Sequence, residues 1–317
     1  MSTTRFENFA KHEILYAMRH VIRSQQFDRK TIENIFETAN LLSKLKSEPM
    51  RGKIMASLFY EPSTRTRLSF ESAMLRLGGG VLSTENAREF SSASKGESLE
   101  DSIRIVSHYA DVIVLRHPEK GATRRAASVS DVPVINAGDG AGQHPTQALL
   151  DLYTIKKELK KIDGIHVAMV GDLKNGRTVH SLAYLLGKYN NISITFVSPK
   201  QLKIGADIKK YLDKHKVIWE EKDSWKDVLA DVDVLYQTRI QKERFKKVSD
   251  YNKLKGTFIL TLKEVKQMKN KSIVMHPLPR VDEISTEVDL SPKAAYFRQA
   301  EYGLHVRMAL LGYLLKR

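Results

Sequence analysis

Short apolar runs alternate with amphipathic stretches along most of the chain. The first half predicts a strand at residues 54–59, a helix at 63–77, a strand at 81–83, a helix at 99–108 and strands at 111–115 and 132–136. A helix at 145–161 follows, since its apolar residues recur at the helical period and Pro145 suits a first turn. The pattern then restarts, with strands at 166–170, 193–197, 217–220, 232–237 and 273–276 and helices at 177–189 and 208–215. Such alternation is typical of parallel α/β sheets.

Two domains are expected, because 317 residues exceed what a single hydrophobic core usually serves. We predict an α/β protein with two parallel-sheet domains, over residues 1–145 and 146–300. A terminal helix with Leu304, Met308 and Leu311 on one face is predicted to return to the first domain, which residues 301–317 then complete.

The composition excludes some chemistry. Without cysteine, the chain has no disulfides, thiolate metal sites or cysteine nucleophiles. The net charge of +15 allows either a nucleic-acid surface or solvated helix faces beside an anion-binding cleft. The second interpretation is favoured, because the lysines are scattered over several predicted elements without a basic stripe interleaved with aromatic residues. The polar start of the chain and the lack of a long apolar run predict a cytoplasmic protein that binds neither nucleic acid nor membrane.

The segment Ser63-Thr64-Arg65-Thr66-Arg67 lies between a predicted strand and a predicted helix. Unpaired helix-start amides, hydroxyls and two guanidiniums would meet at this junction, which suits a doubly charged phosphate. The alternative is an ordinary helix cap with surface charge. We favour the phosphate site, because the two arginines would repel each other without an anion.

Other candidate residues follow predicted strands. Arg116 ends one strand, and His144 and Gln147 share a face at a helix start, where a neutral imidazole can polarise a carbonyl group. Their alternatives are an exposed loop arginine and a structural histidine. The 171–178 loop resembles a nucleotide-binding loop, but it has Arg177 in place of the lysine, and a guanidinium fork suits a carboxylate.

Three further segments have weaker signals. Arg239 and Gln241 follow a strand and either grip an anion or lie in a solvated loop. The serine-rich loop around Lys95 either closes over a ligand or has no role. In the 276–280 segment, two prolines leave backbone carbonyls free to accept hydrogen bonds, and a cis bond before Pro279 is an option.

Taken together, these motifs resemble the aspartate carbamoyltransferases. The resemblance runs from about residue 57 to the carboxyl end, and its motifs occur in the family's order: FYEPSTRTR at 59–67, RHP at 116–118, HPTQ at 144–147, GRT at 176–178, TRIQKER at 238–244 and HPLPR at 276–280. The resemblance implies that the first domain binds carbamoyl phosphate and the second binds L-aspartate.

The resemblance also assigns roles to single residues. It implies that the phosphate is held by Ser63, Thr64, Arg65, Thr66 and Arg116, and that the carbonyl oxygen is polarised by Thr66, Arg116 and His144. It assigns the amino group to Gln147 and the backbone carbonyls of Leu278 and Pro279. It assigns the aspartate carboxylates to Arg177, Arg239 and Gln241. Ser91 and Lys95 are implied to enter the site from a neighbouring subunit, and Glu61 is implied to join Arg177 and Arg244 when the domains close.

The implied reaction is attack of the aspartate amine on the carbamoyl carbon, with expulsion of phosphate and with neither cofactor nor metal. The implied assembly is a homotrimer with shared active sites, to which a separate regulatory chain is an optional addition. Ornithine carbamoyltransferases share the phosphate loop, but they carry a cysteine in the segment corresponding to 276–279 and a Ser-Met-Gly loop, neither of which occurs here. One departure from the family is Asn175, where many members have tyrosine.

Overall fold

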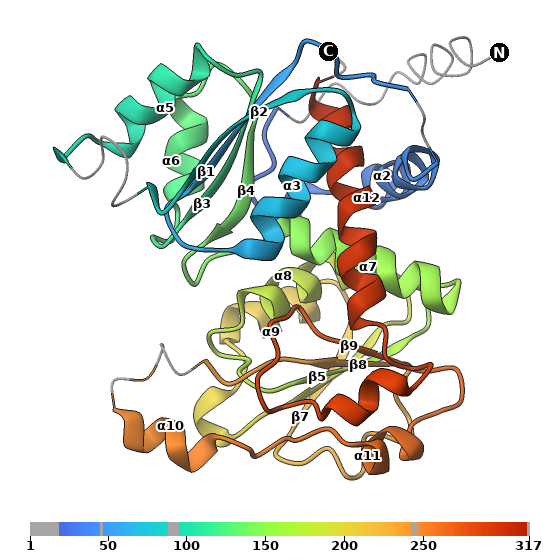
Figure 1. The fold of residues 1–317 in the computed structure, drawn as a ribbon. Helices are drawn as coiled ribbons and strands as arrows, with labels where there is room; N and C mark the ends of the chain where they lie inside the picture. The colour runs from blue at the N-terminus through green and yellow to red at the C-terminus, as the bar shows by residue number, and fades with distance from the viewer. Residues whose placement is uncertain (1–18, 45–46, 88–94, 242–244, 246, 316–317) are drawn as a thin grey trace.

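Two parallel β-sheets form the framework of the chain (Figure 1). The computed structural model describes residues 19–44, 47–87, 95–241, 245 and 247–315. Within them, one sheet has the order β2-β1-β3-β4 and comprises β1 (Ile54–Phe59), β2 (Gly80–Glu85), β3 (Val112–His117) and β4 (Val134–Asp139). The other has the order β7-β6-β5-β8-β9 and comprises β5 (His166–Val170), β6 (Ser193–Val197), β7 (Ile218–Lys222), β8 (Val234–Gln237) and β9 (Ile273–Met275). The paired strands are parallel, which confirms the predicted fold class.

The first sheet is covered by helices on both faces. One face is covered by α3 (Thr64–Arg76), with α2 (Arg29–Leu42) farther from the sheet beyond the terminal helix, and the other by α5 (Leu99–Ser107) and α6 (Ala122–Val129) (Figure 1). Successive residues of a strand point to opposite faces. In β3, Val112 and Val114 therefore join the core that α3 and α2 share, whereas Ile113 and Leu115 join the core beneath α5 and α6.

The second sheet has the same layered arrangement. Its two faces pack against α8 (Arg177–Leu186) with α9 (Ala206–Lys214), and against α11 (Leu262–Gln267) with the 3₁₀ helix η6 (Thr286–Leu290). Val167 and Met169 of β5 lie in the first of these cores, and Ala168 and Val170 lie in the second. Helix α10 (Val248–Leu254) has no buried residue among those described.

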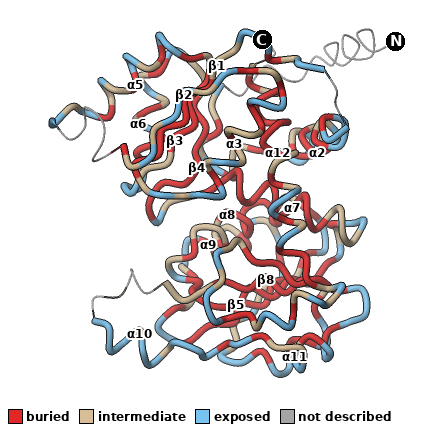
Figure 2. The backbone as a smooth tube through the Cα atoms, viewed as in Figure 1, coloured by how far each residue is buried: buried red, intermediate tan, exposed pale blue. Residues whose placement is uncertain are grey.

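Two long helices tie the sheets together. Residues 145–155 of α7 (Pro145–Leu159) are all buried, and α12 (Tyr296–Leu315) packs against α2, α3 and α7. The Tyr153 ring of α7 contacts Phe36 of α2 and Tyr302 of α12, at centroid distances of 5.2 and 5.8 Å. Figure 2 shows the inner strands of both sheets and the inner faces of these helices as buried, whereas the edge strands β2 and β7 are exposed or intermediate. The terminal helix therefore returns to the first sheet, as predicted.

Some predicted bounds were wrong. Helix α12 begins at Tyr296 rather than at residue 301, and α2, α6, α10 and α11 were not predicted. Helix α2 has a readable signal, because Asp28 caps it with a 2.7 Å bond from the Thr31 N–H and its apolar residues recur at helical spacing. Helix α6 buries only alanine and threonine side chains, so its apolar pattern is weak. None of the helices within the described residues has the length and apolar character that crossing a membrane requires.

Candidate active site

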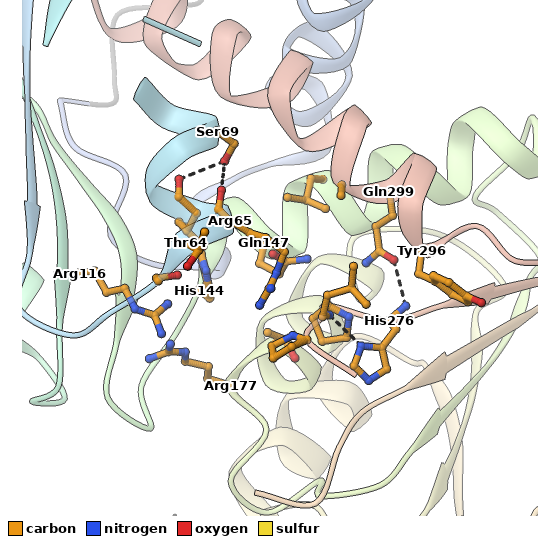
Figure 3. A pocket seen from close by; sticks show the side chains of 18 of the residues that line it. Thr64, Arg65, Ser69, Arg116, His144, Gln147, Arg177, His276, Tyr296 and Gln299 are labelled. Atoms are coloured by element: carbon orange, nitrogen blue, oxygen red, sulfur yellow. Dashed lines mark hydrogen bonds between the residues drawn. The ribbon is translucent and has the colours of Figure 1, made fainter. Parts of the chain in front are cut away.

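A cavity of about 940 Å³ lies between the two sheets, where loops and helix starts from both converge (Figure 3). It brings together most of the residues singled out from the sequence. They are Glu61, Ser63, Thr64, Arg65, Thr66, Arg116, His144, Gln147, Arg177, Arg239, Gln241, Leu278 and Pro279. Because open α/β sheets bind ligands beyond the carboxyl ends of their strands, this location suits a substrate site.

The start of α3 forms one wall of the cavity. Ser63 occupies the N-cap position, yet within the described structure its side chain makes no capping hydrogen bond. The helix-start amides therefore keep hydrogen-bonding capacity for a ligand. The Ser69 hydroxyl donates to the carbonyls of Arg65 and Thr66 at 2.6 and 3.0 Å, which steadies the first turn.

The expectation that two guanidiniums of this segment face the phosphate was wrong for Arg67. Its Nη2 lies 2.9 Å from Glu85 Oε2, and its Nη1 lies 3.3 Å from Glu71 Oε1. Residues 65 and 67 are two positions apart on a helix and so point in different directions. Arg65 lines the cavity, while Arg67 ties α3 to β2.

Arg116 and Arg177 meet from opposite sides of the cavity. Glu61 Oε2 lies 3.3 Å from Arg116 Nη2 and 3.7 Å from Arg177 Nη1, and Arg177 Nη1 donates to the Gly140 carbonyl at 2.8 Å. Burial, followed by the charges of Arg177 and Arg65, lowers the pKa of Arg116 to about 9, against the opposing effect of Glu61. The guanidiniums therefore repel each other, and an anion placed between them would relieve the repulsion.

Gly138 makes this close approach possible. Its φ is +113°, and a Cβ built there would lie 2.9 Å from Arg177 Cζ and 3.2 Å from Arg116 Nη1. A larger residue would displace one guanidinium or both.

His144 is the N-cap residue of α7 and has only 4% of its surface exposed. Its backbone N–H donates to Ser181 Oγ at 3.0 Å, and its Nδ1 lies 3.4 Å from Thr146 Oγ1. Burial, reinforced by Arg177, Arg116 and Arg307, lowers the pKa of His144 well below its usual value. The imidazole is therefore neutral at pH 7 and can donate one hydrogen bond to a carbonyl oxygen.

The 276–280 loop forms the opposite wall. The His276 N–H donates to Gln299 Oε1 at 3.0 Å, and the Leu278 N–H donates to His276 Nδ1 at 2.8 Å (Figure 3). His276 Nε2 lies 2.8 Å from Glu283 Oε1. Leu278–Pro279 is a cis peptide, as the sequence had suggested. These contacts hold a loop whose carbonyls can accept hydrogen bonds.

The 171–178 loop presents Arg177 to the cavity. Its Arg177 reaches across to Gly140 and Glu61, as described above. The Asn175 side chain donates to Asp172 Oδ1 and Oδ2 at 3.2 and 3.1 Å. Burial raises the pKa of Asp172, against hydrogen bonds from Asn175 and the Gln241 backbone. Asn175 thus supports the loop from which Arg177 projects.

Three predicted site residues are not placed in the cavity. Lys95 is exposed and, in the part of the chain that the structure describes, does not line the cavity. Ser91 and Arg244 lie outside the described residues. Conversely, the sequence reasoning missed Gln299 and Arg307 of α12, which line the cavity from the far end of the chain.

Comparison with known proteins identifies the family. Residues 19–157 match the model of the aspartate/ornithine carbamoyltransferase carbamoyl-P binding domain, and residues 163–314 match that of the Asp/Orn binding domain. The chain belongs to the aspartate/ornithine carbamoyltransferase family. It is 58% identical to aspartate carbamoyltransferase 1, chloroplastic, of Pisum sativum over 306 residues, which cover 95% of this chain and 79% of that protein.

Solved structures of this family show the same fold. The catalytic subunit of Methanocaldococcus jannaschii aspartate transcarbamoylase is 51% identical, with a TM-score of 0.87 over 94% of this chain and 98% of that one. Aspartate transcarbamoylase from Trypanosoma cruzi, in complex with carbamoyl phosphate and aspartate, is 41% identical, with a TM-score of 0.89 over 94% and 96% of the two chains. The resemblance seen in the sequence motifs is thereby confirmed.

Proposed function

We propose that the chain is an enzyme that transfers the carbamoyl group of carbamoyl phosphate to the amine of L-aspartate. The products are N-carbamoyl-L-aspartate and phosphate, an early step of pyrimidine biosynthesis. The observation that carries this proposal is the convergence of four arginines on one cavity beside a neutral histidine. They are Arg65, Arg116, Arg177 and Arg239. The similarity to an aspartate transcarbamoylase solved with both substrates supports it.

Carbamoyl phosphate is assigned to the wall formed by α3. The domain that binds it consists of residues 1–145 together with the terminal helix. In this proposal the phosphate receives hydrogen bonds from the helix-start amides and from the following side chains: Ser63, Thr64, Arg65, Thr66 and Arg116. His144, Thr66 and Arg116 donate to the carbonyl oxygen. Gln147 and the carbonyls of Leu278 and Pro279 accept from the amino group.

Aspartate is assigned to the other side of the cavity, and residues 146–300 form the domain that binds it. Arg177, Arg239 and Gln241 bind its two carboxylates. This arrangement favours aspartate over ornithine, because a cationic side chain would be repelled by the guanidiniums.

Catalysis in this scheme depends on orientation and on fixed positive charge. The neutral aspartate amine attacks the carbamoyl carbon, and negative charge develops on the carbonyl oxygen beside His144, Thr66 and Arg116. The C–O bond to the phosphate then breaks, and Arg65 neutralises the charge on the departing phosphate. A phosphate oxygen takes the proton from the amine.

Assembly as a homotrimer with shared sites is also proposed, with Ser91 and Lys95 supplied by a neighbouring subunit. Exposed apolar side chains on neighbouring elements of the first sheet support a contact there: Leu75 of α3 is 60% exposed and Leu82 of β2 is 46% exposed. A regulatory chain is an optional partner, and neither nucleic acid nor membrane is expected to bind. Cytoplasmic residence remains our prediction, although the plant relatives are named chloroplastic.

The deciding experiment supplies the purified protein with carbamoyl phosphate and either aspartate or ornithine. Mass spectrometry should detect N-carbamoyl-aspartate and little product from ornithine. Exclusive carbamoylation of ornithine, or release of phosphate without any carbamoylated amine, would refute the proposal.

A further inference from the structure

Behind the cavity lies a buried carboxylate, Asp151, which contacts groups on three separate elements. It is 0% exposed and, within the described structure, does not line the cavity. Its Oδ1 accepts from Gln147 Nε2 at 2.8 Å and from Gln299 Nε2 at 2.6 Å, and its Oδ2 accepts from the Tyr236 hydroxyl at 2.7 Å. These partners belong to α7, α12 and β8 respectively.

The carboxylate fixes which way both amides face. An ionised carboxylate only accepts hydrogen bonds, so each glutamine must turn its NH₂ group toward Asp151. The carbonyl end of each amide then points away from Asp151. Gln299 uses that oxygen to accept from the His276 N–H at 3.0 Å, and so holds the 276–280 loop. Gln147, which lines the cavity, is left with its oxygen as an acceptor.

The charge balance around Asp151 is consistent with an acceptor at this position. Burial has the largest effect and raises the pKa of Asp151 to about 7. The three hydrogen bonds, and then the charge of the buried Arg307 guanidinium, oppose burial and favour the ionised form. At pH 8 the carboxylate therefore predominates, and all three of its hydrogen-bonding neighbours can act as donors.

We propose that Asp151 is the positioning residue that makes this site select an NH₂ group on its substrate. It acts on two parts of the cavity lining, because it orients the Gln147 oxygen directly and the 276–280 carbonyls through Gln299. This inference rests on the proposed function, in which these acceptors bind the amino group of carbamoyl phosphate. A ligand with a methyl group at that place would gain nothing from them.

Acetyl phosphate is the probe for this selection, since it has the phosphate and carbonyl of carbamoyl phosphate but a methyl group in place of NH₂. The measurement is the ratio of the affinities for carbamoyl phosphate and acetyl phosphate at pH 8, with inorganic phosphate as a third ligand. In Asp151→Leu, both amides lose their acceptor and can rotate. The ratio should fall about tenfold or more, while the affinity for inorganic phosphate changes by less than about threefold.

Asp151→Asn is the conservative variant. Its amide oxygen can still accept from both glutamines, and its NH₂ can turn to the Tyr236 hydroxyl oxygen. It should therefore keep the ratio within about threefold of the unmodified protein. Thr154→Val is the matched control, because Thr154 is also buried on α7 and donates only to the Leu150 carbonyl in the described structure. Its ratio should not change.

If folded Asp151→Leu lost affinity equally for carbamoyl phosphate, acetyl phosphate and inorganic phosphate, the inference would be overturned, because a merely structural role gives that result. An unchanged ratio, or an equal loss in Asp151→Asn, would also overturn it. Should Asp151→Leu fail to fold, Gln299→Met decides, because it breaks the link to His276 and should lower the ratio. If the unmodified protein transfers no carbamoyl group, the proposed function itself fails.

Discussion

Replacing Gly138 with alanine would test whether the close pairing of Arg116 and Arg177 is needed for activity. The added Cβ would lie 2.9 Å from Arg177 Cζ, whereas ordinary contacts begin at 3.4 Å, so the guanidinium must move by about 0.5 Å (3.4 − 2.9). It cannot move freely, because Arg177 is held by Gly140 and lies beside Glu61. Since a displacement of about 1 Å can cost about 100-fold in rate, we expect kcat/KM for aspartate to fall about tenfold.

The variant also strains the backbone, so it needs a control. Alanine in the left-handed helical region costs about 1–2 kcal/mol. Gly52 has a φ of +80°, and no described atom lies within 4 Å of its hypothetical Cβ. Gly52→Ala should therefore lower Tm through backbone strain alone, without changing kcat/KM. Steady-state kinetics and thermal unfolding of both variants suffice, and equal kcat/KM values for the two would refute the reasoning.

Three further predictions concern ionisable side chains in or beside the same cavity. Arg65→Met should lower kcat by about 10²–10³-fold with little change in Tm. Arg67→Met should instead cost about 1 kcal/mol of stability in urea unfolding and leave kcat nearly unchanged. The reverse pattern in the two variants would contradict the contacts of Arg67. Glu61→Ala should lower kcat/KM about tenfold with a small change in Tm, and unchanged kinetics would count against its role in bringing Arg177 to the site. Burial keeps His144 neutral in the folded protein, whereas in the unfolded chain it takes up a proton below its ordinary pKa of about 6.5. Its contribution therefore lowers the free energy of unfolding as the pH falls below that value. In urea unfolding, the decrease in this free energy between about pH 7.5 and 5.5 should be smaller in His144→Gln, and an equal decrease would argue against the interpretation.

The predictable part of the site follows from local geometry. Pro145 marks a helix start, and a spacing of three residues places His144 and Gln147 on one face. Arg116 lies at the end of β3, and the carboxyl ends of parallel strands share one edge of a sheet. These relations depend only on residues near each other in the sequence, so the sequence alone sufficed.

The unpredicted part depends on contacts between distant segments. Arg67 faces Glu85 because the register of β1 against β2 pairs Phe59 with Glu85. Asp151 meets Tyr236 and Gln299 across 85 and 148 residues. No periodicity reveals such partners. One local signal was available for Asp151, since a charged residue in the apolar run of α7 requires buried partners.

The cavity concentrates positive charge that the fold by itself does not neutralise. Glu61 offsets part of the charge of Arg116 and Arg177, yet burial and the neighbouring arginines still hold the pKa of Arg116 at about 9. This repulsion is a cost to the folded protein, and a doubly charged phosphate bound beside Arg65 and Arg116 would remove it. The same charge is then already in place when negative charge develops during carbamoyl transfer, so no reorganisation is needed at that moment. An anion-binding site and a catalytic site therefore require the same arrangement of guanidiniums, which explains why the protein tolerates their mutual repulsion.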